Sequence, residues 1–253
     1  MDTVSISCVV LACIVLGAML GAFIRNFVSE DHLNSDAKDV VKLATALMAT
    51  LSALVLGLLI GTAKTSFDTR RTQVRQVAAN IILLDQLLAQ YGPDTMKARK
   101  IARRNIKVLV DQVWHRKESK LGEPAPFEAG RESEELFHAM YALSPKNELQ
   151  RAVQGRIVRV ATALAQTRLS LFVESSNTIS VPFLVILVFW LTIIFVIFSL
   201  LTRLHILVGI ILFFCALSVS GAIFLILDLD RPFSGMMQIS SAPIHNALAP
   251  LNP

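Results

Sequence analysis

The 253-residue chain is poor in the residues that build catalytic, metal or disulfide sites. It has three cysteines, five histidines and 7% aromatic residues, and only 17% of its residues are charged. Cys8, Cys13 and Cys215 lie in apolar segments without Cys-x-x-Cys spacing, which predicts small buried side chains rather than zinc ligands or disulfides. The histidines are isolated from one another and from acidic clusters, and no phosphate-binding loop occurs. We therefore expect no metal, no cofactor and no enzyme activity.

No segment shows the alternating pattern of a β-strand, whereas long apolar runs are prominent. Hydrophobic residues make up 54% of the chain and form four blocks, residues 4–24, 44–62, 181–201 and 206–227. Each block reaches the roughly 20 residues that a helix needs to cross a bilayer. The first block lacks the basic flank of a signal peptide, so we expect it to be retained. The sequence predicts an all-α integral membrane protein with four transmembrane helices.

Charge is concentrated between the second and third blocks. Residues 63–180 hold 19 of the 24 Lys and Arg residues and 12 of the 19 acidic residues, a formal charge of 19 − 12 = +7. Positive charge favours the cytoplasmic side, so we expect this stretch and both termini in the cytoplasm of a bacterium, with the protein in its inner membrane. The predicted divisions are a first transmembrane pair (1–62), a helical cytoplasmic region (63–180), a second transmembrane pair (181–227) and a C-terminal tail (228–253).

Helical periodicity predicts the elements of the cytoplasmic region. The second apolar block continues as helix up to the Gly92-Pro93 break, and a second helix runs from Asp94 to the Gly- and Pro-rich break at 122–126. A shorter helix lies around 132–143. Ser144-Pro145 then predicts an N-cap and first helical residue of another long helix, which pairs with the extension of the second block.

The second of these helices carries a basic face between Lys97 and Lys107. Such a face attracts phosphate groups of nucleic acid or anionic lipid through its charge density. It lacks interleaved aromatic residues and lies near scattered acidic residues, so a solvated surface is favoured and no nucleic-acid partner is expected.

Two kinds of side chain recur along the membrane helices. Small residues at four-residue spacing predict close helix packing, within one chain or between subunits: Gly17 and Gly21 in the first block, and Ala49, Ala53, Gly57 and Gly61 in the second. Leu47, Leu51 and Val55 are also spaced by four. In a ring of identical subunits they could form a narrow apolar constriction, and otherwise they face lipid or the protein core.

The last apolar block ends in a charged segment. Asp228, Asp230 and Arg231 precede Pro232, which stops the helix, and Gly235 follows. The two carboxylates lie about 200° apart on a helix, which argues against a two-carboxylate site and favours a local Asp–Arg pair.

These tail residues, followed by Ser240-Ser241-Ala242-Pro243, resemble the ending of proteins of the bestrophin-like domain family. Tyr91-Gly92-Pro93, Ala142-Leu143-Ser144-Pro145 and Pro182-Phe183-Leu184 are also similar to the layout of that family. The family is distantly similar to bestrophins, pentameric anion channels whose second transmembrane helix lines a hydrophobic neck.

The resemblance implies positions for a pore in this chain. Leu56-Gly57-Leu58 and Phe67-Asp68-Thr69-Arg70-Arg71 fall on the bestrophin pattern, although the two tryptophans of that pattern are absent and no acidic run suited to calcium occurs. Leu47, Leu51 and Val55 then fall where neck residues lie. The residues expected at the cytoplasmic mouth are Lys64, Asp68, Arg70 and Arg71.

Two functions remain open from the sequence. The first is an oligomeric ion channel, pentameric by resemblance, that passes small anions through a pore lined by the second transmembrane helix. The second is a membrane-anchored helical scaffold or regulatory protein without conductance. Both have the lipid bilayer as a partner, and the number of subunits distinguishes them.

Overall fold

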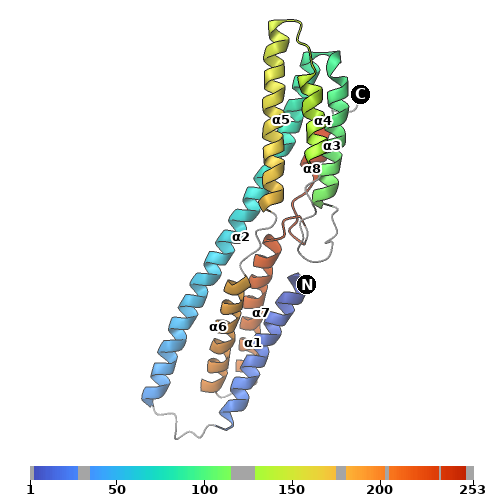
Figure 1. Ribbon diagram of the computed structural model, residues 1–253. Coiled ribbons are helices and arrows are strands. Elements are labelled where there is room, and N and C mark those ends of the chain that lie inside the picture. Colours follow the sequence, from blue (N-terminus) through green and yellow to red (C-terminus); the bar gives the residue numbers. More distant parts are fainter. Residues whose placement is uncertain are drawn as a thin grey trace. The chain divides into compact units, whose positions relative to one another are not determined.

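The computed structural model describes residues 3–27, 35–114, 129–174, 181–202, 205–233 and 235–248. Its helices are α1 (Thr3–Arg25), α2 (Ser35–Tyr91), α3 (Met96–Trp114), α4 (Ala129–Tyr141), α5 (Glu148–Glu174), α6 (Val181–Leu201), α7 (Ile206–Leu229) and α8 (Ala242–Leu248), with the short 3-10 helix η2 (Pro93–Thr95) before α3 (Figure 1). No strand occurs in the described ranges, and α1, α2, α6 and α7 are long and apolar enough to cross a membrane. The predicted fold class is confirmed.

The chain divides into two units. The membrane unit comprises Met1–Phe67 and Thr178–Met237, and the polar unit comprises Asp68–Asn177 and Gln238–Pro253. Helix α2 contributes its first half to the membrane unit and its second half to the polar unit. The tail, which the sequence presents as one segment from residue 228, is divided between the units after Met237.

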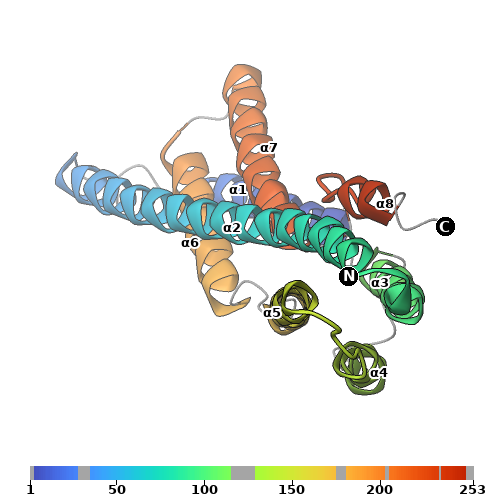
Figure 2. The same cartoon turned by 90° about the horizontal axis from the view of Figure 1, so that it is seen from above.

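In the membrane unit, α1 packs along both α6 and α7 (Figure 2). Ile14, Leu187 and Ile223, one from each helix, are fully buried at the centre of this contact. The hydroxyl of Ser220 on α7 donates a hydrogen bond of 2.8 Å to the backbone carbonyl of Ser7 on α1. A hydrogen bond inside a lipid-surrounded bundle adds to packing, which is the main source of helix association in a bilayer.

The polar unit has its own hydrophobic core. Buried side chains from α2, α3, α4 and α5 meet there, among them Leu88, Met140 and Ile157, which are fully buried. An ion pair between Asp85 of α2 and Arg99 of α3, with 2.7 Å from Nε to Oδ1, lies at the edge of this core. The amphipathic spacing of these helices thus produces a helical bundle whose apolar faces are covered by one another.

The turn between α2 and α3 follows from three residues. Gly92 adopts a φ of 122°, in which a side chain would be strained, and Pro93 cannot continue the helix. The buried hydroxyl of Thr95 donates to the carbonyl of Leu88 at 2.7 Å, which satisfies one of the last carbonyls of α2. The predicted end of α2 before Gly92-Pro93 is confirmed.

Helix α5 begins at Glu148, so the prediction that Ser144-Pro145 starts this helix was wrong. Asn147 is the cap, because its Oδ1 accepts a hydrogen bond of 2.8 Å from the backbone N–H of Gln150. The Oε1 of Gln150 accepts from the N–H of Lys146 at 2.7 Å. The side-chain N–H of Gln150 also donates to the carbonyl of Tyr91, the last residue of α2, at 3.1 Å.

The end of the described chain packs in the polar unit. The indole N–H of Trp114 donates to the carbonyl of Ile239 at 2.7 Å, and Ile244 of α8 is fully buried. The segment after Met237 is therefore fixed by hydrogen bonding and by apolar burial together.

Candidate pore helix and tail motif

One face of α2 is buried in the protomer. Thr45, Ser52 and Leu59 are buried and follow one another at seven-residue intervals, and Ala63 and Phe67 continue the same face. Leu59 and Ala63 belong to the hydrophobic core formed with α1, α6 and α7. Seven residues make nearly two helical turns, so these side chains point in one direction.

The opposite face of α2 is uncovered and rich in leucine. Leu47 and Leu51 are 63% and 44% exposed, and Leu54 and Leu58 are exposed as well. Leu47 and Leu54 are seven residues apart, as are Leu51 and Leu58, which is the heptad spacing of helices that pack on one another. Val55, the third constriction candidate, is half-buried against the core of the membrane unit. Two of the three candidates therefore share the uncovered face.

The small residues of α1 and α2 lie in different surroundings. A Cβ on Gly17 would be 2.7 Å from Cγ2 of Thr192, and one on Gly21 would be 3.0 Å from the Cα of Val196, so both glycines let α1 approach α6 closely. A Cβ on Gly57 or Gly61 would meet nothing within 4 Å. In the same stripe of α2, Ala49 is half-buried and Ala53 is exposed. The glycines of α2 therefore have room for a neighbour that the protomer does not supply.

The four residues expected at the mouth of a pore do not share one environment. Lys64, Asp68 and Arg71 are exposed, and Nζ of Lys64 lies 5.7 Å from the ring centroid of Phe67. Arg70 is only 4% exposed and lies on the same face of α2 as Val74. In the protomer, Lys64 and Arg71 are thus the basic side chains that this segment offers to solvent.

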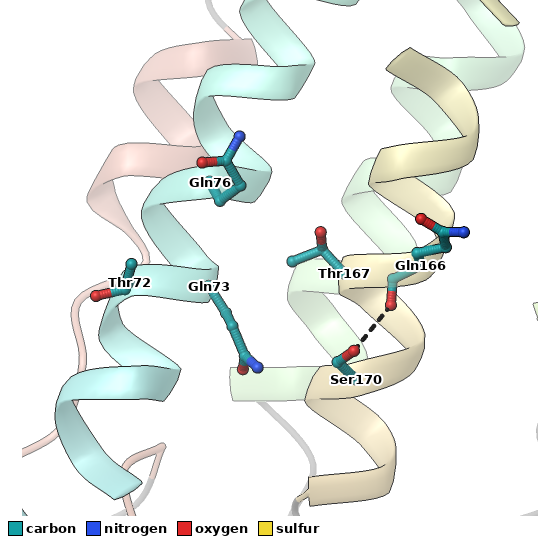
Figure 3. A pocket seen from close by; sticks show the side chains of 6 residues that line it. All are labelled: Thr72, Gln73, Gln76, Gln166, Thr167 and Ser170. Atoms are coloured by element: carbon teal, nitrogen blue, oxygen red, sulfur yellow. Dashed lines mark hydrogen bonds between the residues drawn. The ribbon is translucent and has the colours of Figure 1, made fainter. Parts of the chain in front are cut away.

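A polar pocket of about 310 Å³ lies in the polar unit beside α2. Thr72, Gln73 and Gln76 of α2 line it together with three residues of α5, and the side chains of Gln73 and Thr167 extend into the space between the two helices (Figure 3). The residues from α5 are Gln166, Thr167 and Ser170.

The hydroxyl groups of this pocket bond to their own helices. Thr72, Thr167 and Ser170 each donate to the carbonyl four residues earlier, at 2.9, 2.9 and 3.2 Å. Their oxygen lone pairs and the glutamine amides remain the polar groups that line the space. Thr72 lies two heptads after Leu58 in α2. The face of α2 that carries the leucines therefore carries a polar residue at this later position.

In the tail motif, the carboxylate of Asp228 organises the chain that follows α7. Asp228 is only 1% exposed, and its two oxygens accept hydrogen bonds from the backbone N–H groups of Met236 and Met237 at 3.2 and 2.9 Å. Gly235 has a φ of 116°, and a Cβ there would lie 3.2 Å from Cγ of Asp228 and closer still to one carboxylate oxygen. The buried carboxylate therefore fits only beside a glycine.

Replacing Gly235 by Ala should destabilise the membrane unit. The added Cβ would meet the buried carboxylate and force the backbone out of a conformation that L-residues rarely adopt, at a cost of about 1–3 kcal/mol. The check is the midpoint of thermal unfolding in detergent. Gly155→Ala on α5, where no atom lies within 4 Å of the new Cβ, is the control and should not lower the midpoint. Equal midpoints for Gly235→Ala and wild type would contradict the role of Asp228.

A family model for the bestrophin-like domain matches residues 12–244. The chain belongs to the bestrophin-like domain family. Neither the curated proteins nor the solved structures contain a match to it. The match covers α2, α6 and α7 in full and α1 from residue 12 onward. It also covers the tail motif and the polar unit as far as the start of α8.

In this bestrophin-like protein the described residues hold no group of three or more His, Cys, Asp or Glu side chains that could bind a metal ion. The three cysteines are free and exposed on the surface of the membrane unit, so the prediction that they are buried was wrong. Membrane helices are apolar on every side, and the sequence therefore does not indicate which side faces the core.

Sequence reasoning missed several residues that shape these sites. Leu54 and Leu58 were passed over because a spacing of four was followed, whereas the seven-residue repeat would have found them. No sequence pattern indicates the polar pocket, because the residues of α2 and α5 that line it lie about 90 positions apart in the chain. The hydrogen bonds that Asp228 accepts from the backbone N–H groups of Met236 and Met237 likewise depend on the conformation of Gly235.

Proposed function

We propose that this bestrophin-like protein is an oligomeric ion channel of a bacterial inner membrane, in which α2 of each subunit lines a pore for small anions. The uncovered leucine face of α2 is the observation that carries the proposal. It is apolar, it repeats in heptads, and it lies opposite the face that packs on α1, α6 and α7. Heptad faces of this kind associate with copies of themselves around an axis.

The same face has the chemistry of a channel constriction. A ring of leucine side chains blocks hydrated ions by dewetting when the passage is narrow. Leu47 and Leu51 are the residues we assign to this ring, with Leu54 and Leu58 on the same face. Val55, half-buried in the protomer, contributes to the packing of α2 rather than to the ring.

Anion preference in this proposal comes from the basic residues beyond the leucines. Lys64 and Arg71 are exposed, and positive side chains at the mouth of a low-dielectric passage raise the local concentration of anions. Membership of a family that contains anion channels also supports a preference for anions over cations. The polar unit then lies in the cytoplasm, as the distribution of Lys and Arg indicates.

The number of subunits tests the proposal. Native mass spectrometry of detergent-purified protein, with two-dimensional class averages of the same sample, should give a closed ring, and a pentamer is expected from the resemblance to bestrophins. Monomers or dimers would contradict the pore. They would favour a membrane-anchored scaffold, whose leucine face contacts lipid.

A further inference from the structure

A second apolar space lies in the membrane unit, away from α2. It has a volume of about 430 Å³ and is lined by residues of α1, α6 and α7, including Ala18, Ala22, Gly209 and Phe213. The end of α1, the end of α6 and the start of α7 surround it, and these lie at the same end of the membrane unit (Figure 1). The space therefore opens near one surface of the bilayer.

Water does not suit this space. At about 30 Å³ for each molecule, it would take on the order of ten waters, and each ordered water needs two to four polar partners. Among the described residues, the wall has one polar side chain, that of Ser199, and its hydroxyl is fully buried. An apolar occupant suits the wall.

A positive charge marks the mouth of the space. Arg25 is the last residue of α1, one turn beyond Ala22, and its Nη1 donates a hydrogen bond of 3.3 Å to the carbonyl of Leu200, the residue after Ser199. The guanidinium is half-buried and holds further N–H donors besides the one in this bond. An arginine at this level of a membrane helix attracts the phosphate of a lipid.

We propose that this pocket binds an anionic phospholipid, with an acyl chain between α1, α6 and α7 and the phosphate at Arg25. The apolar walls match the acyl chain of such a lipid, and the arginine at the end of α1 matches its phosphate. None of the described residues that line the pocket belongs to α2. This site is therefore independent of the proposed pore, and either can fail alone.

Native mass spectrometry with added phosphatidylglycerol tests the site. Wild-type protein should carry bound phosphatidylglycerol, and Gly209→Leu should lose it, because the new side chain fills the pocket while its Cβ meets no atom within 4 Å. Gly221→Leu makes the same change in the same helix, also with no atom within 4 Å, but outside the pocket. It should bind as wild type does.

Charge is tested by Arg25→Gln. This variant should bind phosphatidylglycerol about fivefold more weakly, the effect of one basic residue at a membrane surface. Its binding of phosphatidylethanolamine should fall less, because the ammonium of that lipid offsets the charge of the phosphate. Circular dichroism of each variant confirms that it is folded. Equal lipid binding by Gly209→Leu and wild type would overturn the proposal. So would equal loss in Gly221→Leu, or a wild-type protein that binds no lipid because a neighbouring subunit fills the pocket.

Discussion

Liposomes containing the Leu51→Ala variant should release chloride faster than liposomes containing wild-type protein. Leu51 lies on the uncovered face of α2, and in a ring its side chain would narrow the passage once for each subunit. Removing it widens and wets the constriction. A barrier lower by about 1.4 kcal/mol raises a rate about tenfold, and we expect at least this increase because the change is repeated around the ring.

The folding of this variant should be little affected, which makes the flux result interpretable. Leu51 is 44% exposed in the protomer, so truncation leaves no cavity within one chain. Leu16→Ala on α1 is the matched control, because Leu16 is 63% exposed and lies on another helix. It should leave chloride flux unchanged. The constriction is misplaced if Leu51→Ala conducts like wild type, or if Leu16→Ala raises flux equally.

The sequence predicts the helices well because their signals are local. The apolar block of α2 and the helical spacing after it fall within one uninterrupted stretch, and Gly92-Pro93 ends that stretch wherever the rest of the chain lies. The start of α5 was harder, since Asn147 and Ser144-Pro145 are both capping signals within four residues. Only the hydrogen bond from Gln150 distinguishes them.

The sites depend on contacts between distant residues, which one sequence does not encode visibly. Cys8, Cys13 and Cys215 could not be assigned to a face, because the helices that carry them are apolar all round. Arg70 reads as a mouth residue in sequence, and its burial becomes apparent only when α2 is placed in the fold. The same holds for the glycines of α1 and α2. Their spacing predicts close helix packing, but it does not indicate which helix packs against them.

Those glycines allow a direct comparison of packing within and between subunits. Gly21→Ala should lower the thermal unfolding midpoint strongly, because its Cβ would overlap the backbone of Val196 and α1 would have to move away from α6. Overpacking of this kind costs about 1–3 kcal/mol, and here the opposing atoms are backbone, which yields less easily than a side chain. A midpoint equal to that of wild type would show that α1 and α6 are farther apart than described.

The same substitution at Gly57 should act on assembly instead. Its Cβ meets nothing in the protomer, so Gly57→Ala in an isolated subunit should stabilise α2 by about 0.5–1 kcal/mol through helix propensity. In a ring where neighbouring α2 helices approach at Gly57 and Gly61, the added methyl group instead separates them and lowers the fraction of full rings in native mass spectra. If the thermal unfolding midpoint rises and the fraction of full rings is unchanged, Gly57 lies away from the subunit interface. If the protomer is folded but full rings are lost, Gly57 lies at that interface.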